Sequence, residues 1–128
     1  YNSEFDSKFD AVLCDVPCSG LGVINDNPDI KLNKTIENIH NLTKEQTSII
    51  NNVSRYAKIG GALYYSTCSI LDEENIDVVK QFLLENPNFV IEEITSKLKH
   101  EKIDGTLQFL PDISGGNGFY VAKLKRVK

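Results

Sequence analysis

The chain has 128 residues, 41% of them hydrophobic and 25% charged, with a net charge of −4. This composition is typical of one soluble globular domain, and no stretch approaches the roughly 20 apolar residues that a membrane helix needs. The N-terminus lacks the basic start and apolar stretch of a signal peptide, so we expect a cytoplasmic protein without membrane contact. Three cysteines, an odd number, indicate free thiols rather than a disulfide framework.

The first predicted element is a strand at residues 9–16, where a nearly continuous hydrophobic run is typical of a strand covered on both faces. Pro17 and Gly20 end it. Residues 21–41 are rich in Asn and Asp and contain the turn signal Asn27-Pro28-Asp29, so we expect a long irregular loop. Loops of this length in compact domains are usually functional.

A helix is predicted at residues 43–59. It starts at a capping box, Thr43-Lys44-Glu45-Gln46, and Gly60-Gly61 tolerates a left-handed cap at its end. Residues 62–67 follow as a strand. Residues 11–67 therefore predict a strand, a crossover helix and a second strand parallel to the first.

A second helix is predicted to start at Asp72, as its N-cap, and to end at Asn86-Pro87. Four hydrophobic residues at helical spacing form its buried face: Ile76, Val79, Phe82 and Leu83.

Two further strands are predicted at residues 89–94 and 118–125, separated by a polar loop at residues 95–106. The turn signal at 115–118 favours a hairpin-like antiparallel edge for the last strand. The basic residues that concentrate near the C-terminus are interpreted as the solvated end of this strand rather than as an RNA clamp: Lys123, Lys125, Arg126 and Lys128. The negative net charge does not indicate nucleic-acid binding either.

Chemically active side chains follow both predicted parallel strands. Asp15 and Cys18 come at the end of the first strand and Cys68 at the end of the second, where open α/β sheets bind their ligands. We expect nearby exposed amides and the following helix to lower the pKa of these thiols. The two strand ends therefore predict a site for covalent catalysis.

Cys14 lies inside the first predicted strand and is interpreted as a buried core residue. For any single cysteine of this chain, a role as a small buried hydrophobic residue is the alternative to a chemical one. A zinc site of Cys14, Cys18 and Cys68 is not favoured, because their spacing is unusual for zinc. Both histidines, His40 and His100, fall in predicted loops, which also disfavours a Cys-His nucleophile pair. No metal is predicted.

Three blocks, residues 9–31, 60–75 and 107–125, resemble successive signature blocks of the RNA cytosine-C5 methyltransferases. Within that family they most resemble the Sun/Fmu type, which acts on small-subunit ribosomal RNA. The motifs Asp-Val-Pro-Cys-Ser-Gly at 15–20 and Thr-Cys-Ser at 67–69 are specific, and the resemblance spans essentially the whole chain. Four positions depart from the usual family residue, none of them a thiol: Val16, Asn27, Leu32 and Asn117.

The resemblance implies an α/β fold, the C-terminal half of a Rossmann-like S-adenosylmethionine-dependent methyltransferase sheet. Two parallel strands plus an antiparallel terminal pair, flanked by helices, would lie in the order 11–16, 62–67, 118–125, 89–94. We expect residues 1–128 to be the C-terminal portion of one catalytic domain whose cofactor-loop half lies upstream. Strand 11–16 would then expose an edge, through which we expect self-association.

The resemblance also implies a reaction. The Cys68 thiolate would add to C6 of a cytosine in ribosomal RNA, so that C5 accepts a methyl group from S-adenosylmethionine. Asp15 would act at N3 of the base, beside the cofactor, and Cys18 in product release. Pro17 would join Asp15 in binding the cofactor. The expected substrate-binding residues are Ser19, Gly20, Asp29 and Lys31.

The chain alone is expected to be inactive, because the resemblance puts the cradle of the cofactor upstream. Two other functions stay open. One is a non-catalytic binding or pseudoenzyme fragment of the same fold. The other is a thiol redox protein that uses Cys18 and Cys68.

Overall fold

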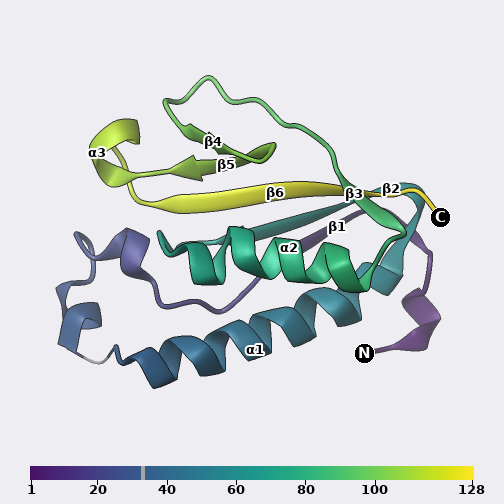
Figure 1. Cartoon of the computed structure of the whole chain (residues 1–128), viewed down its shortest axis with the longest axis horizontal. Helices are drawn as coiled ribbons and strands as arrows, with labels where there is room; N and C mark the ends of the chain where they lie inside the picture. The colour runs from purple at the N-terminus through teal and green to yellow at the C-terminus, as the bar shows by residue number, and fades with distance from the viewer. Residues whose placement is uncertain (33) are drawn as a thin grey trace.

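The computed structural model describes residues 1–32 and 34–128, and in them a six-stranded sheet accompanied by three helices (Figure 1). The strands are β1 (Phe9–Asp15), β2 (Ala57–Thr67), β3 (Phe89–Ile91), β4 (Glu101–Ile103), β5 (Thr106–Phe109) and β6 (Phe119–Arg126). The helices are α1 (Ile36–Val53), α2 (Ile76–Glu85) and α3 (Pro111–Ser114).

β1 and β2 are parallel neighbours joined through α1, with Asp15 opposite Ser66. β6 runs antiparallel on the other side of β2, with Thr67 opposite Tyr120, and β3 pairs antiparallel with the C-terminal part of β6. The predicted order of these four strands, and the division into a parallel and an antiparallel pair, are therefore confirmed.

The predicted start of the first helix at residue 43 is wrong. α1 begins at Ile36, because the Thr35 hydroxyl accepts a hydrogen bond from the Asn38 amide at 3.2 Å. The Thr43 hydroxyl instead donates to the His40 carbonyl inside the helix, so His40 is not in a loop. The predicted loop at 21–41 also contains two 3-10 turns, Leu21–Val23 and Pro28–Leu32, and its residue 33 lies outside the described residues.

The end of this helix and the start of the next strand also differ from prediction. α1 ends at Val53, and a 3-10 turn at Ser54–Tyr56 leads directly into β2 at Ala57. Gly60 and Gly61 are therefore part of β2 and not a helix cap. Gly60 has a φ of +83° and lies where the register between β1 and β2 shifts, so its left-handed conformation serves an irregularity in the strand.

Helix α2 has the predicted buried face and the predicted end, but Asp72 is not its N-cap. A 3-10 turn at Asp72–Glu74 precedes the helix, and Asn75 occupies the cap position without a side-chain capping bond. The side chains of Glu74 and Asn75 are fully buried instead. They are used for tertiary hydrogen bonds, which local capping rules do not foresee.

The polar loop predicted at 95–106 is wrong at its C-terminal end. β4 lies within it, and β5 begins at Thr106 and pairs with both β4 and β6. Short strands at a sheet edge carry too little hydrophobic alternation to be recognised from sequence. The hairpin-like antiparallel connection expected before the last strand is confirmed, with α3 and the glycines at 115–118 between β5 and β6. The expected edge is wrong, because β6 pairs with β2 on one side and with β5 and β3 on the other.

The core lies between the sheet and the two long helices, which cover the same face of the sheet (Figure 1). Alternate residues of each strand enter it, as a side-chain period of two requires. Fully buried members include Leu63 and Tyr65 of β2, Tyr120 and Leu124 of β6, and Phe82 of α2. Among the described residues, no helix is long and apolar enough to cross a membrane.

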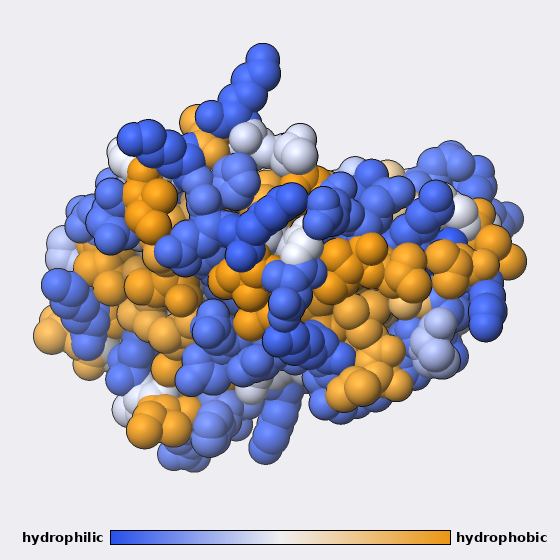
Figure 2. All heavy atoms as spheres, turned by 45° about the horizontal axis from the view of Figure 1, so that its top comes forward, coloured by the Kyte–Doolittle hydropathy of each residue, from blue (hydrophilic) through white to orange (hydrophobic). Residues whose placement is uncertain are grey.

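Neither α1 nor α2 covers the opposite face of the sheet. The side chains of Leu13, Tyr64 and Lys123 lie in one row across it, and Leu13 is 72% exposed. Figure 2 brings this side forward and shows hydrophobic side chains gathered toward both ends of the molecule.

The basic C-terminal residues make structural contacts. Glu92 lies 2.5 Å from the Lys123 Nζ and 3.8 Å from that of Lys125. Arg126 donates to the Ala57 carbonyl at 2.7 Å. These contacts agree with the interpretation as a strand end rather than an RNA clamp.

Candidate active site

Cys18 and Cys68 lie in the loops that follow β1 and β2. Because the two strands are parallel and in register at Asp15 and Ser66, both loops leave the sheet at the same edge. The Sγ atoms are 2.8 Å apart, in hydrogen-bond contact, and both thiols are free and half-buried. The structure thus brings together the two thiols that the sequence placed at the strand ends.

A buried carboxylate, that of Glu74, connects the two cysteine loops. Its Oε1 accepts from the Ser19 backbone amide at 2.7 Å and from Gln46 Nε2 at 3.1 Å. Its Oε2 accepts from the Ser19 hydroxyl at 2.6 Å and from the Ser69 hydroxyl. Ser19 directly follows Cys18 and Ser69 directly follows Cys68. One side chain therefore holds each loop at the residue next to its cysteine.

The neighbouring residue, Asn75, extends this network. Its Nδ2 donates to the Ser69 carbonyl at 3.0 Å and to Gln108 Oε1 at 2.9 Å, while the Thr67 hydroxyl donates to its Oδ1 at 2.5 Å. Thr67 and Ser69 lie on either side of Cys68. Since buried polar groups that are fully hydrogen-bonded rigidify a structure, Cys68 is presented on a stiff support.

A close crossing of two glycines packs the cysteine loops against β6. The Gly22 amide donates to the Cys68 carbonyl at 2.9 Å, and the Gly118 amide donates to the Gly22 carbonyl at 2.7 Å. A Cβ on Gly22 would lie 2.4 Å from the Gly118 oxygen and 2.6 Å from the Cys68 oxygen. Only glycine allows the three backbone segments to approach this closely.

Burial, and after it the hydrogen bond with Cys68, raise the pKa of the Cys18 thiol to about 12. The Gly20 backbone lowers this pKa, as expected for a loop amide, but by less than burial raises it. The predicted lowering of the thiol pKa is therefore wrong for Cys18. Cys18 therefore keeps its proton at neutral pH, and in the contact between the sulfur atoms either thiol can be the donor.

Cys14 is a core residue, as the sequence indicated. It is 3% exposed, and burial raises the pKa of its thiol to about 12. Among residues 1–32 and 34–128, no group of three or more His, Cys, Asp or Glu side chains is arranged to hold a metal ion.

Asp15 and Pro17 lie exposed where the chain leaves β1. The Ser66 hydroxyl donates to Asp15 Oδ1 at 2.8 Å, and both side chains project from the face that α1 and α2 leave uncovered. Among the described residues the structure gives Asp15 Oδ2 no hydrogen-bond partner. Asp15 Oδ2 is therefore open to a hydrogen bond with a ligand bound at this edge.

The four residues predicted to bind substrate fall into two environments. Ser19 and Gly20 are buried, and both donors of Ser19 go to Glu74. Asp29 and Lys31 are exposed on the turn Pro28–Leu32, which packs on the cysteine loop where Ile30 meets Gly20. Lys31 also lines a pocket of about 230 Å³. Contact of any of the four with substrate stays a prediction.

Sequence reasoning missed Glu74, Asn75 and Gln46. Glu74 is the last of three consecutive acidic residues, Asp72, Glu73 and Glu74, and no local feature distinguishes the buried one from its exposed neighbours. The sequence around Gln46 predicts a capping box. Gln46 lies in the middle of α1, and its Nε2 donates to the Pro17 carbonyl at 2.9 Å as well as to Glu74.

The family model described as "16S rRNA methyltransferase RsmB/F" matches residues 1–125 of the chain. Ribosomal RNA small subunit methyltransferase B of Pasteurella multocida is 40% identical over 127 residues, which cover 98% of this chain and 28% of that protein. Probable ribosomal RNA small subunit methyltransferase B of Bacillus subtilis is 37% identical over 124 residues, covering 93% and 28%. The chain thus spans little more than a quarter of the length of these relatives.

Solved structures show the same likeness. The crystal structure of PH0851 superposes with a TM-score of 0.89 at 30% identity, over 94% of this chain and 27% of that one. NSun6 from Pyrococcus horikoshii, crystallised with SFG, superposes with a TM-score of 0.77 at 30% identity, over 91% and 29%.

Proposed function

This chain belongs to the 16S rRNA methyltransferase RsmB/F family, and we propose that the protein that carries it transfers a methyl group from S-adenosylmethionine to C5 of a cytosine in small-subunit ribosomal RNA. The observation that carries the proposal is the contact of 2.8 Å between Cys18 and Cys68 at the carboxyl edge of parallel strands. The names of the relatives support the RNA substrate. The crystal structure of NSun6 with SFG, an analogue of S-adenosylmethionine, supports the cofactor.

Cys68 supplies the nucleophile in this proposal. Its thiolate adds to C6 of the cytosine, and the electron pair of the C5–C6 double bond moves into the ring, which makes C5 nucleophilic. S-adenosylmethionine, when bound, supplies the methyl group as an electrophile for C5. The Cys18 S–H, held 2.8 Å from the Cys68 sulfur, stabilises the thiolate before it adds.

Asp15 acts on the pyrimidine ring in this proposal. Addition at C6 develops negative charge that reaches N3, where a hydrogen-bond donor or acid lowers the barrier. Asp15 lies exposed at the same edge as the thiols, and Ser66 orients its carboxyl group. The exposed surface formed by Asp15 and Pro17 also fits contact with the cofactor, since ligands of open α/β sheets lie outside the carboxyl ends of the strands.

Release of the product requires the C6–S bond to Cys68 to break. After a base takes the proton from C5, the C5–C6 double bond re-forms and the pair of the C6–S bond returns to the Cys68 sulfur. The Cys18 thiol donates to that sulfur and so stabilises the departing thiolate. Cys18 is therefore assigned to release and Cys68 to bond formation.

Trapping of the covalent adduct tests these roles. The full-length protein is incubated with S-adenosylmethionine and small-subunit ribosomal RNA that carries 5-fluorocytidine. In this base, fluorine replaces the C5 proton that must be removed before the product is released. We expect a stable protein–RNA adduct on denaturing gels that is lost in Cys68→Ala and kept in Cys18→Ala. Cys14→Ala is the matched control and should form the adduct, because Cys14 lies in the core. An adduct that persists in Cys68→Ala would overturn the assignment.

The same contact between the sulfur atoms is the observation that favours the second candidate, a thiol redox function for Cys18 and Cys68. Thiol–disulfide exchange needs a thiolate, and because the pKa of Cys18 is raised, Cys68 would have to supply it, as it does in the methyl transfer. Titration against glutathione buffers separates the two functions. A redox protein forms the disulfide at a defined potential, whereas the methyltransferase proposal expects both thiols to stay reduced under cytosolic conditions.

A further inference from the structure

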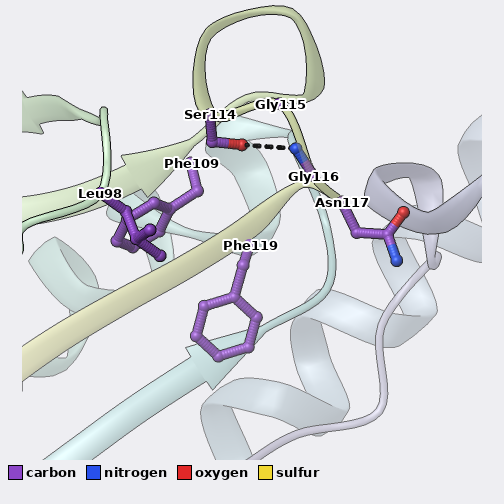
Figure 3. A pocket seen from close by; sticks show the side chains of 7 residues that line it. All are labelled: Leu98, Phe109, Ser114, Gly115, Gly116, Asn117 and Phe119. Carbon is purple, nitrogen blue, oxygen red and sulfur yellow. Dashed lines mark hydrogen bonds between the residues drawn. The ribbon is translucent and has the colours of Figure 1, made fainter.

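A pocket of about 520 Å³ opens beside the start of β6. Figure 3 shows its lining: Leu98 and Phe109 lie together on one side, the Phe119 ring lies across from them, and the Ser114–Asn117 segment closes the top. The volume lies within the range of small-molecule sites. Nothing in the proposed methyl transfer uses this pocket.

The pocket adjoins the candidate active site. Gly118, between the lining residues Asn117 and Phe119, donates its amide to Gly22, and Gly22 donates to the Cys68 carbonyl. Phe119 precedes the core residue Tyr120, so alternation along β6 places its side chain on the sheet face opposite the core. Asp15 projects from that same face. A ligand in the pocket would therefore lie on the same face of the sheet as a base held at Asp15.

The lining has the chemistry of a stacking site. Phe119 is 39% exposed and Leu98 is 64% exposed, so neither is buried in a core of its own. A Cβ on Gly115 or Gly116 would meet nothing within 4 Å, so the glycine side of the pocket is open. Two aromatic rings beside open backbone suit a flat ring such as a nucleobase, because any base has a π-face that stacks on an aromatic side chain.

Two positive charges stand next to a lining residue in the sequence. Lys97 and Lys99 are exposed on either side of Leu98 in the chain. Neither lysine forms an ion pair with a described residue, whereas Lys102 in the same segment is paired with Glu93 at 3.2 Å. Two unpaired lysines that flank a lining residue in the chain suit the phosphates on either side of an inserted base.

We propose that this pocket binds an unpaired nucleobase of the ribosomal RNA near the target cytosine, stacked on Phe109 and Phe119, with Lys97 and Lys99 at the flanking phosphates. The inference rests on the proposed function and deepens it, since it names a second contact with the RNA. The target cytosine goes to Cys68, and this second base fixes the position of the strand.

Steady-state kinetics of the full-length protein on unmethylated small-subunit ribosomal RNA test the proposal. Loss of one stacking ring should raise KM about tenfold in Phe109→Ala and in Phe119→Ala, while kcat changes less than twofold. Phe119→Tyr, which keeps the ring, should restore the wild-type KM. The matched control is Phe5→Ala, because Phe5 is 44% exposed and lies outside the pocket. Wild-type KM in both pocket variants overturns the proposal.

A second measurement does not depend on the folding of the aromatic variants. Lys97→Ala and Lys99→Ala change exposed side chains, and each should reduce the slope of log KM against log salt by about 0.7. RNA containing 4-thiouridine should crosslink to residues 106–119. An unchanged slope, or crosslinks only elsewhere, overturns the pocket while the Cys68 adduct still supports methyl transfer. Failure of the adduct in the wild type would instead overturn the proposed function itself.

Discussion

Alternate residues of the same strands serve different purposes on the two faces of the sheet. On β6, Tyr120 and Leu124 are fully buried beneath the helices, whereas Phe119 and Lys123 lie on the face that α1 and α2 leave uncovered. On the covered face, the hydrogen bonds of the buried Glu74 side chain fix both cysteine loops. The uncovered face presents Asp15 and the aromatic pocket. The two-residue period of a strand thus separates the rigid support on one face from the proposed ligand contacts on the other.

The largest effect on the free energy of unfolding is expected from removing the Glu74 carboxylate, which holds both cysteine loops. Glu74→Ala leaves the Ser19 amide and hydroxyl, the Ser69 hydroxyl and the Gln46 amide without this acceptor, and unpaired buried donors cost about 1–3 kcal/mol each. We expect the free energy of unfolding in urea to fall by about 3–5 kcal/mol. Glu73→Ala, at the exposed neighbouring carboxylate, is the control and should change it by less than 0.5 kcal/mol. Equal losses in the two variants would contradict the role of Glu74.

The glycine crossing should produce the next largest effect. In Gly22→Ala the new methyl group would collide with backbone oxygens of Gly118 and Cys68, which side-chain rotation cannot relieve. A loss of about 2–3 kcal/mol in the free energy of unfolding is expected, measured by urea denaturation. Gly116→Ala is a matched control, because its Cβ meets nothing within 4 Å. If both variants are as stable as the wild type, the close approach of the three segments is not required.

The buried thiols should make stability fall at alkaline pH. An unfolded thiol ionises near its ordinary pKa of 9.0, whereas folded Cys14 and Cys18 keep their protons to about pH 12. Between these values the unfolded state loses protons that the folded state retains, so the free energy of unfolding falls as pH rises. Each thiol contributes at most about 1.4 kcal/mol per pH unit.

Urea denaturation at pH 9, 10 and 11 measures this slope of the free energy of unfolding against pH. Cys14→Ala should flatten it relative to the wild type, and Gly116→Ala should leave it unchanged. A slope identical in Cys14→Ala and the wild type would show that the Cys14 thiol does not stay protonated in the folded protein.

The smallest effect on stability is expected at the free edge of the sheet. Within residues 1–32 and 34–128, β1 pairs only with β2, and Leu13 is exposed on it. Unpaired edges invite pairing with another copy, so we expect this chain to self-associate. Leu13→Lys should shift sedimentation toward the monomer while changing the free energy of unfolding by less than 0.5 kcal/mol. Leu84→Lys, at a leucine of α2 that is 79% exposed, should leave the association unchanged. A monomeric wild-type chain would refute the proposal.

Local patterns were sufficient to place β1, β2, β6 and the body of both long helices, because period and turn residues act over a few positions. The same patterns, with the rule that parallel strands end at one edge, placed Cys18 and Cys68 together. Patterns failed where two local signals compete or are weak. Thr35 and Thr43 both offer a helix start, and the hydrogen bond to Asn38 determines which is used.

The features that local sequence rules could not predict depend on segments far apart in the chain. Glu74 is buried because Ser19, Gln46 and Ser69 all converge on it, and nothing in the run from Asp72 to Glu74 shows this convergence. The raised pKa of Cys18 follows from burial by the same packing. The chain sequence thus places the reactive groups at the ends of neighbouring strands. The protonation of Cys18 and the rigidity of both cysteine loops arise only when distant segments pack together, because desolvation and buried hydrogen bonds belong to the assembled fold.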